Sequence, residues 1–220
     1  MSTVLAIKQL GKSFPSAAGE VHAVRDVSLE VADGELVTIR GPSGCGKSTL
    51  LMAAGGLLEP TSGSVEVNGT DLYSLGHDGR ARFRAENIGF VFQQFHLIPY
   101  LDVRDNILAA SLAIAKANGE RIDELREVFG LEHRAPHVPA ALSTGEKQRT
   151  AMARALLNNP KLILAAEPTG NLDQDNAEAL LEQLSGFTDK GGAVLLVTHD
   201  ARVDDHAGRT IEISDGNLVS

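Results

Sequence analysis

The segment at positions 41–49, GPSGCGKST, constrains the fold of this chain more than any other feature of its sequence. It fits the pattern G-x-x-x-x-G-K-S. Residues 35–40 before it alternate like a short strand, and residues 48–58 after it are rich in Leu and Ala, which indicates a helix. Glycines let successive backbone N–H groups turn toward an anion without Cβ clashes, and the positive end of the next helix adds its dipole. An incidental glycine-rich turn would lack this context, so the segment predicts a P-loop that binds a nucleoside triphosphate.

The side chains of this loop have separate chemical roles. The Lys47 ammonium can reach the β- and γ-phosphates, and the Ser48 hydroxyl is the usual Mg²⁺ ligand of such loops. Cys45 is the only cysteine, which excludes an intrachain disulfide and favours a reducing compartment, and we interpret it as a space-filling residue rather than a nucleophile. The candidate nucleotide-binding residues of the loop are Gly41, Ser43, Gly44, Cys45, Gly46, Lys47, Ser48 and Thr49.

Length and composition allow one substantial α/β unit, since the chain has 220 residues of which 43% are hydrophobic. The net charge is −9, the isoelectric point is near 5.2, and no cluster of four or more Lys or Arg residues occurs, so we expect no nucleic-acid surface. The most apolar stretches, 107–117 and 193–198, are shorter than the roughly 20 residues of a transmembrane helix, and no signal peptide is evident. We expect a cytoplasmic protein unless a partner holds it at a membrane.

Hydrophobic alternation and turn residues predict the remaining elements. The expected strands are residues 4–10, 21–31, 64–68, 162–166, 193–197, 209–214 and 217–219. The expected helical segments are 102–131, capped by Asp102 or Asp105, 143–157 and 174–187. Tight turns are expected at Asp33-Gly34, Asn68-Gly69 and Asp215-Gly216. Continuous apolar strands on either side of a helix indicate parallel pairing, so the pattern predicts an α/β core with a small antiparallel sheet and a helical insertion.

Further motifs follow the P-loop in a fixed order. They are IGFVFQQ at 88–94, LSTGEKQR at 142–149, LILAAEPTGNLD at 162–173 and VTHD at 197–200, and Phe14 precedes the loop. Together with the P-loop these motifs resemble those of the ATP-binding cassette (ABC) transporter ATPases, and the resemblance covers essentially the whole chain. The runs FQQFHLIP and EPTGNLD are similar to those of the subgroup that serves lipoprotein-release, macrolide-export and cell-division transporters.

The resemblance implies a P-loop NTPase core of the ABC ATPase type, with a small antiparallel β-subdomain and an inserted α-helical subdomain. It implies a single domain over 1–220, in which 1–93 and 158–220 form the core and 94–157 form the helical subdomain with the signature helix. It also implies ATP and Mg²⁺ as cofactors, a head-to-tail homodimer that sandwiches ATP, and a separate transmembrane permease. The chain would then lie on the cytoplasmic face of the inner membrane, held there by that permease.

Three residues are candidates for the catalysis that the resemblance implies. Glu167 can accept a proton from water aligned with the γ-phosphate, and its alternative role is to cap the Pro168 turn. Gln93 can offer its side-chain oxygen to Mg²⁺ or to the attacking water, and in the family it also senses the permease; otherwise it is a surface amide. His199 matches the family's switch histidine, which contacts the γ-phosphate, although a lone His is most often a plain hydrogen-bonding residue. The candidate metal ligands are Ser48 and Gln93.

Other candidate residues lie at helix and strand ends. Ser143 and the backbone N–H groups near Gly145 can form a second anion site, and Ser143 with Glu146 also fits a capping box. In the family this loop binds the γ-phosphate of ATP held by the other subunit, and Asp173 matches the aspartate that couples the two sites. Phe14 matches the ring that stacks on adenine, although it could equally fill the edge of the small sheet.

Besides Phe14, which replaces the more usual Tyr and lacks its hydroxyl, the sequence departs from the family pattern at three positions. Thr144 and Glu146 replace the usual Gly and Gln, and these variants could weaken dimer closure. Ala166 occupies the position of the aspartate that helps to hold Mg²⁺, and loss of such a carboxylate costs about 10–100-fold in metal affinity or activity. Either the natural protein is a slow ATPase or a nucleotide-dependent clamp, or this residue was altered in a working ATPase, which is the explanation we favour.

Three functions are compatible with these motifs. We predict the ATP-binding subunit of an ABC transporter, which hydrolyses Mg·ATP in a head-to-tail dimer and whose hydrolysis is impaired by Ala166. A soluble ABC ATPase outside transport, such as an assembly factor, has the same motifs, and only its partner distinguishes it. A non-hydrolysing, ATP-dependent dimerisation module is supported by Ala166 alone.

Overall fold

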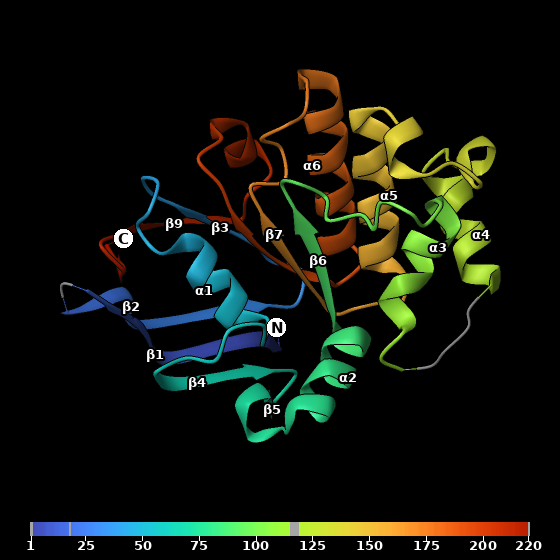
Figure 1. Cartoon of the computed structure of the whole chain (residues 1–220). Helices are drawn as coiled ribbons and strands as arrows, with labels where there is room; N and C mark the ends of the chain where they lie inside the picture. The colour runs from blue at the N-terminus through green and yellow to red at the C-terminus, as the bar shows by residue number, and fades with distance from the viewer. Residues whose placement is uncertain (1, 18, 115–118, 220) are drawn as a thin grey trace.

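A parallel sheet forms the centre of the molecule (Figure 1). The computed structural model of the chain describes residues 2–17, 19–114 and 119–219. Within these ranges the sheet has six strands in the order β10-β9-β3-β8-β7-β6, and only β10 runs antiparallel to its neighbour. The strands are β3 (Leu36–Arg40), β6 (Ile88–Phe92), β7 (Leu162–Ala166), β8 (Ala193–Val197), β9 (Arg209–Ser214) and β10 (Asn217–Leu218). The predicted buried strands and terminal hairpin are thus confirmed.

Both faces of this sheet are covered by helices, which explains why β7 and β8 are apolar throughout. Leu164 packs in one apolar cluster with residues of α1 (Lys47–Ala54). Val194 packs in a second cluster with residues of α5 (Thr144–Leu156) and α6 (Gln174–Thr188). Figure 1 shows α1 between the central sheet and the second sheet of the molecule, with α5 and α6 on the other side.

The second sheet is antiparallel and has the strand order β2-β1-β4-β5. Its strands are β1 (Thr3–Ser16), β2 (Gly19–Ala32), β4 (Ser62–Val67) and β5 (Thr70–Asp71). The tight turn between β4 and β5 uses Asn68 at φ 49° and Gly69 at φ 74°, which matches the predicted Asn-Gly turn. The small antiparallel sheet of the sequence prediction is therefore present, with its first two strands longer than expected.

The segment expected to be helical over 102–131 is divided. Helix α3 (Val103–Leu108) begins after Asp102, whose Oδ1 accepts from the Asp105 amide at 2.8 Å, so Asp102 is the cap. A 3₁₀ turn follows α3, and α4 (Gly119–Val128) forms the second half. Residues 115–118 of the expected segment lie outside the described residues.

One helix ends earlier than predicted, and another helix was not predicted. Helix α1 ends at Ala54 rather than near residue 58, because Gly55 and Gly56 follow it and Gly56 has φ 68°. Helix α2 (His77–Asn87) was not predicted, since it buries only Arg80 and so shows no apolar stripe. Within the described ranges, no helix is both long and apolar enough to cross a membrane.

Candidate functional site

The predicted P-loop joins β3 to α1, with the expected strand, loop and helix in place. Gly46 is the N-cap residue of α1 and has φ 107°, a conformation that favours glycine. A Cβ on Gly46 would also collide with the carbonyl oxygen of Ala23 in β2. The backbone of this loop is therefore held in a shape that a residue with a side chain could not adopt.

Lys47 is folded back against the loop. Its Nζ donates to the carbonyl oxygens of Gly41 at 2.7 Å and Pro42 at 3.0 Å, and the residue is only 8% exposed. Cys45 lies beneath it, 5% exposed and packed in the apolar cluster of α1. The position of Cys45 agrees with its interpretation as a space-filling residue.

A cavity of about 350 Å³ lies over the loop and brings distant segments together. Its lining residues are Ala23, Ser43, Gly44, Gly46, Lys47, Ser48, Thr49, Gln93, Glu167 and His199. Gln93 follows β6, Glu167 follows β7 and His199 lies just after β8, so all three come from the carboxyl ends of parallel strands, as does the P-loop. Open parallel sheets bind their ligands at this edge.

Glu167 is the acidic residue among the described residues that line the cavity, and several contacts hold its carboxylate. Its Oε2 accepts from the Thr198 hydroxyl at 3.0 Å and from the His199 amide at 3.2 Å, and it lies 3.0 Å from His199 Nδ1. Its own amide donates to Val197 at 2.8 Å, and its φ of 46° is in the left-handed region. Thr198 is fully buried and was not singled out from the sequence, although it belongs to the VTHD motif. The structure therefore adds Thr198 as a residue that orients the carboxylate.

The loop after Glu167 contacts the segment after β6. The side-chain nitrogen Nδ2 of Asn171 donates to the backbone carbonyl oxygen of Gln93 at 2.8 Å. A Cβ on Gly170 would lie 2.6 Å from Gln93 Nε2, so glycine allows this close approach. Neither contact was predicted, since nothing in either segment alone indicates the other.

Asp200 anchors the same loop from the other side. Its Oδ2 accepts from the Thr169 hydroxyl at 2.7 Å and from Arg202 Nη2 at 2.6 Å. The hydrogen bonds from Arg202 are the main cause that holds the pKa of Asp200 well below its usual range, and the Thr169 hydroxyl adds to the effect. An ionised Asp200 therefore ties the segment that carries His199 to the loop that carries Glu167.

The N-terminus of α5 forms the capping box that the sequence predicts. Ser143 Oγ accepts from the Glu146 amide at 3.2 Å, and Glu146 Oε2 accepts from the Ser143 amide at 2.7 Å. Arg134 Nε donates to Glu146 Oε1 at 2.7 Å. The Ser143 amide first, and then Arg134, lower the pKa of Glu146 to about 2. The Glu146 carboxylate therefore interacts with the Ser143 amide of the cap and with the Arg134 side chain.

Ser143, Gly145 and Asp173 come together, but not at the cavity over the P-loop. Asp173 is the N-cap of α6 and accepts from the Asn176 amide at 2.9 Å, which lowers its pKa. Gly145 of α5 packs directly against the Asn176 side chain, where a Cβ would collide with Oδ1. The N-termini of α5 and α6 therefore form one separate surface.

A protein-family model described as "ABC transporter" matches residues 24–170 of the chain, from β2 through the P-loop to the loop after Glu167. The chain is an ABC transporter ATP-binding cassette. This membership agrees with the family resemblance and the fold class inferred from the sequence motifs.

Curated relatives cover the cassette from end to end. The lipoprotein-releasing system ATP-binding protein LolD 1 of Rhodopirellula baltica is 44% identical over 98% of this chain and 96% of its own length. The macrolide export ATP-binding/permease protein MacB of Shigella flexneri is 40% identical over 100% of this chain, which spans only 34% of MacB. The cassette thus corresponds to nearly all of the first relative and to one part of the second.

A solved structure shows the same fold. The structure titled as the dimeric form of MJ0796, a bacterial ABC transporter cassette, superposes with a TM-score of 0.91 at 37% identity and covers 98% of this chain and 97% of its own. A second, titled as a dimeric post-hydrolysis state of MJ0796 bound to ADP and Pi, superposes at 0.89 with 36% identity over 98% and 97% of the two chains. The α/β fold with an antiparallel subdomain and a parallel core sheet is therefore that of the ABC cassettes.

Phe14 is not among the residues that line the P-loop cavity of the cassette. It is near the end of β1, is 37% exposed and has Lys12 Nζ 5.1 Å from its ring centroid. Its ring is accessible, so the expected stacking on adenine stays a prediction.

The cavity offers few metal ligands of its own. Glu167 is the one carboxylate that lines the cavity within the described residues, and Ala166 before it, at the end of β7, packs against the apolar cluster of α1. No group of three or more His, Cys, Asp or Glu residues suited to a metal occurs in the described part of the cassette. Ser48 and Gln93 line the cavity with oxygen atoms, which suits Mg²⁺ because that ion is usually bound by few protein ligands together with substrate phosphates.

Proposed function

We propose that this cassette hydrolyses Mg·ATP between two copies of itself and drives a separate membrane permease. The observation that supports this proposal best is the Glu167 carboxylate in the P-loop cavity, held by Thr198 and His199. A cavity with a phosphate-binding loop on one side and an oriented base on the other suits phosphoryl transfer to water.

The residues that line the cavity have separate roles in the proposed reaction. The backbone N–H groups of the loop and Lys47 bind the phosphates, while the helix dipole of α1 favours their negative charge. Glu167 Oε2 makes all of the contacts given above, which leaves Oε1 to accept a proton from water. His199 holds Glu167 in place and contacts the γ-phosphate. Mg²⁺, when bound by Ser48 and Gln93, neutralises charge on the phosphates.

The N-termini of α5 and α6 support the head-to-tail arrangement. Ser143, Gly145 and Asp173 are outside the cavity of their own chain, so we propose that they complete the nucleotide site of a second copy. Two helix N-termini side by side suit a phosphate of the nucleotide that the P-loop of the other copy binds. The dimeric form named for MJ0796 is consistent with such a pairing.

We place the permease at a groove of about 380 Å³ that α2, β6 and the C-terminal half of α5 line. Ile88, Phe90 and Ile98 give it apolar walls, and Leu57 is 48% exposed at its edge. The groove belongs partly to residues 94–157, which we propose to be a helical subdomain inserted into the core of 1–93 and 158–220. Through this contact the cassette would lie on the cytoplasmic face of the inner membrane.

We further propose that Ala166 reduces Mg²⁺ affinity and turnover. The absence of a second carboxylate among the described lining residues supports this. The relatives named for lipoprotein release and macrolide export favour transport over the assembly-factor alternative. Measurable turnover would exclude the non-hydrolysing module.

The test is ATP hydrolysis together with the oligomeric state of the purified cassette, with and without ATP and Mg²⁺. We expect a monomer that becomes a dimer with Mg·ATP and releases phosphate, and that Lys47→Ala abolishes both. Co-purification with a membrane permease would then separate transport from a soluble role. A cassette that stays monomeric and releases no phosphate, even as Ala166→Asp, would contradict the proposal.

A further inference from the structure

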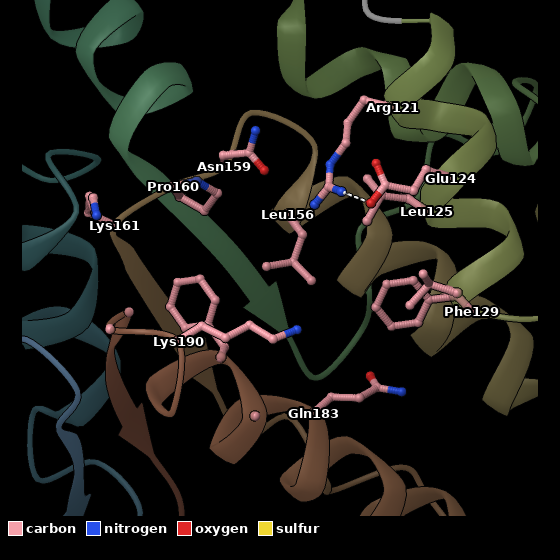
Figure 2. Close-up of a pocket in the computed structure, with 15 residues that line it drawn as sticks. Arg121, Glu124, Leu125, Phe129, Leu156, Asn159, Pro160, Lys161, Gln183 and Lys190 are labelled. Carbon is pink, nitrogen blue, oxygen red and sulfur yellow. Dashed lines mark hydrogen bonds and ion pairs between the residues drawn. The ribbon is translucent and has the colours of Figure 1, made fainter.

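A second cavity, of about 450 Å³, lies at the opposite end of the central sheet from the P-loop (Figure 2). It is formed by α4, the end of α5, the loop before β7 and the C-terminal end of α6 with the turn that follows. It shares no lining residue with the P-loop cavity. Its volume is in the range of small-molecule sites.

The walls of this cavity are apolar. Leu125 of α4, Phe129 just after α4 and Pro160 before β7 are buried side chains that line it, and Leu156 and Phe187 add partly buried surface. In Figure 2 Leu156 lies near the middle of the space, between α4 and α6. Such a lining suits a ligand with a hydrocarbon or aromatic body.

The charges at the mouth are mostly positive. Arg121, Lys161 and Lys190 line the cavity, against one carboxylate, Glu124, which pairs with Arg121 Nη1 at 2.5 Å. Figure 2 shows Arg121 and Lys190 reaching into the space from opposite sides. Neither Lys161 nor Lys190 has an ion-pair partner among the residues that the structure describes. Glu124 balances Arg121, so Lys161 and Lys190 leave an excess of positive charge among the lining residues, in a chain of net charge −9.

Two polar atoms beside this space also lack partners. Arg121 Nε and Gln183 Oε1 are buried without a hydrogen bond in the described part of the chain. Buried polar atoms normally find a partner. Arg121 Nε carries a donor that suits an anionic group, whereas Gln183 Oε1 can only accept a hydrogen bond. The site therefore combines apolar walls with buried polar atoms that have no hydrogen-bond partner among the described residues.

We propose that this cavity binds a small organic anion with an apolar body, a carboxylate or phosphate monoester whose head group lies between Arg121 and Lys190. The apolar part would occupy the space lined by Leu125, Leu156 and Phe187. This site is independent of the proposed ATPase function, because it shares no lining residue with the P-loop cavity.

Gly186 of α6 offers a selective way to fill the cavity. It lines the space, and a Cβ built there meets no atom within 4 Å. Its φ is not in the left-handed region, and replacing a helical glycine generally favours the helix. Gly186→Leu should therefore fold and occupy the volume, while Gly186→Ala is the matched variant that leaves most of it open.

The binding experiment uses eight-carbon probes and isothermal titration calorimetry on the full chain. Octanoate and octyl phosphate carry the two candidate head groups, octylammonium carries the opposite charge on the same body, and acetate carries the head group alone. We expect saturable one-to-one binding of at least one anionic probe and none of octylammonium or acetate. The arm that binds more tightly identifies the head group.

Substitutions at residues that line the cavity test whether the probes bind there. Gly186→Leu should weaken binding about ten-fold or more, since the apolar body loses its space. Lys190→Gln should weaken it about two- to five-fold, and Lys8→Gln, which removes the same charge from the antiparallel sheet, should leave it unchanged. Failure of both anionic probes to bind, equal binding of octylammonium, or unchanged binding in both Gly186→Leu and Lys190→Gln would overturn the proposal.

Discussion

The Nδ1 atom of His199 lies 3.0 Å from the Oε2 atom of Glu167, at the ends of neighbouring strands β8 and β7. The Thr198 hydroxyl donates to the same oxygen, so three groups of one motif fix the orientation of a single carboxylate. A carboxylate held in this way needs no reorganisation before it accepts a proton.

Glu167→Gln should therefore remove the base while keeping its shape, because the amide oxygen can still accept from Thr198. We expect steady-state phosphate release to fall about 100-fold or more, with ATP binding retained. The matched control is Glu178→Gln, which removes a carboxylate that contacts His206 far from the cavity. A loss of less than about three-fold for Glu167→Gln would exclude Glu167 as the general base.

Ala166→Asp should lower the Mg²⁺ concentration needed for half-maximal hydrolysis and raise the rate, each by about ten-fold or more. The reason is that Ala166 is at the carboxyl end of β7, beside the only carboxylate among the described lining residues. Ala166→Asn has nearly the same shape without the charge and is the control. Equal rates for Ala166, Asp and Asn would show that this position does not limit metal binding.

The capping box of α5 predicts a specific pH dependence. The pKa of Glu146 falls from its ordinary 4.5 to about 2 in the folded chain, so the carboxylate binds fewer protons folded than unfolded. Its stabilising contribution is thus complete above about pH 4.5 and is lost as the pH falls toward about 2. We expect Glu146→Gln to lower the free energy of unfolding by about 1 kcal/mol at pH 7.

Urea unfolding between pH 7 and pH 3 measures this effect. The difference between Glu146→Gln and the unmodified chain should shrink as the pH falls below about 4.5, whereas exposed Glu182→Gln should show little difference at any pH. A gap that stays constant across this range would mean that the Glu146 charge contributes nothing to the cap.

The contact between Gly145 and Asn176 predicts non-additive substitutions. Gly145→Ala forces the Asn176 side chain to move from Asp173 and should cost about 1–3 kcal/mol of stability. In an Asn176→Ala background the clash is absent, so the added cost of Gly145→Ala should fall below about 1 kcal/mol. Thermal or denaturant unfolding of the four chains measures this coupling, with Gly79→Ala, whose Cβ would meet Leu75 at 3.7 Å, as the control glycine. Additive costs would mean that the two helix N-termini do not constrain each other.

The strands of the core were predictable because both-sided burial leaves a direct trace in the sequence. Residues 162–166 and 193–197 are apolar throughout, and both are strands at those bounds. Helix α2 leaves no such trace because it buries only Arg80, so local patterning could not predict it. The divided helical segment after Asp102 likewise has helical composition without a signal for where α3 ends.

The sequence likewise predicted some residues of the candidate site and missed others. Motif chemistry named Gln93, Glu167 and His199, and the structure brings all three to the P-loop cavity. The same reasoning named Ser143, Gly145 and Asp173, which lie elsewhere on the cassette, and it missed Thr198 and Asn171. Hydrogen bonds of those two residues join segments that are 31 and 78 positions apart, and no local pattern encodes such pairs.

The sequence by itself determined the chemistry of the loop, the apolar strands of the core and the family, since these depend on residue types and their spacing along the chain. The tertiary structure alone decided which oxygen of Glu167 accepts hydrogen bonds and which groups contact the Glu146 carboxylate. It alone also showed that an apolar cavity with cationic residues lies between α4 and α6. Those properties arise from packing between segments remote in sequence, and distance in space is not a local property of the chain.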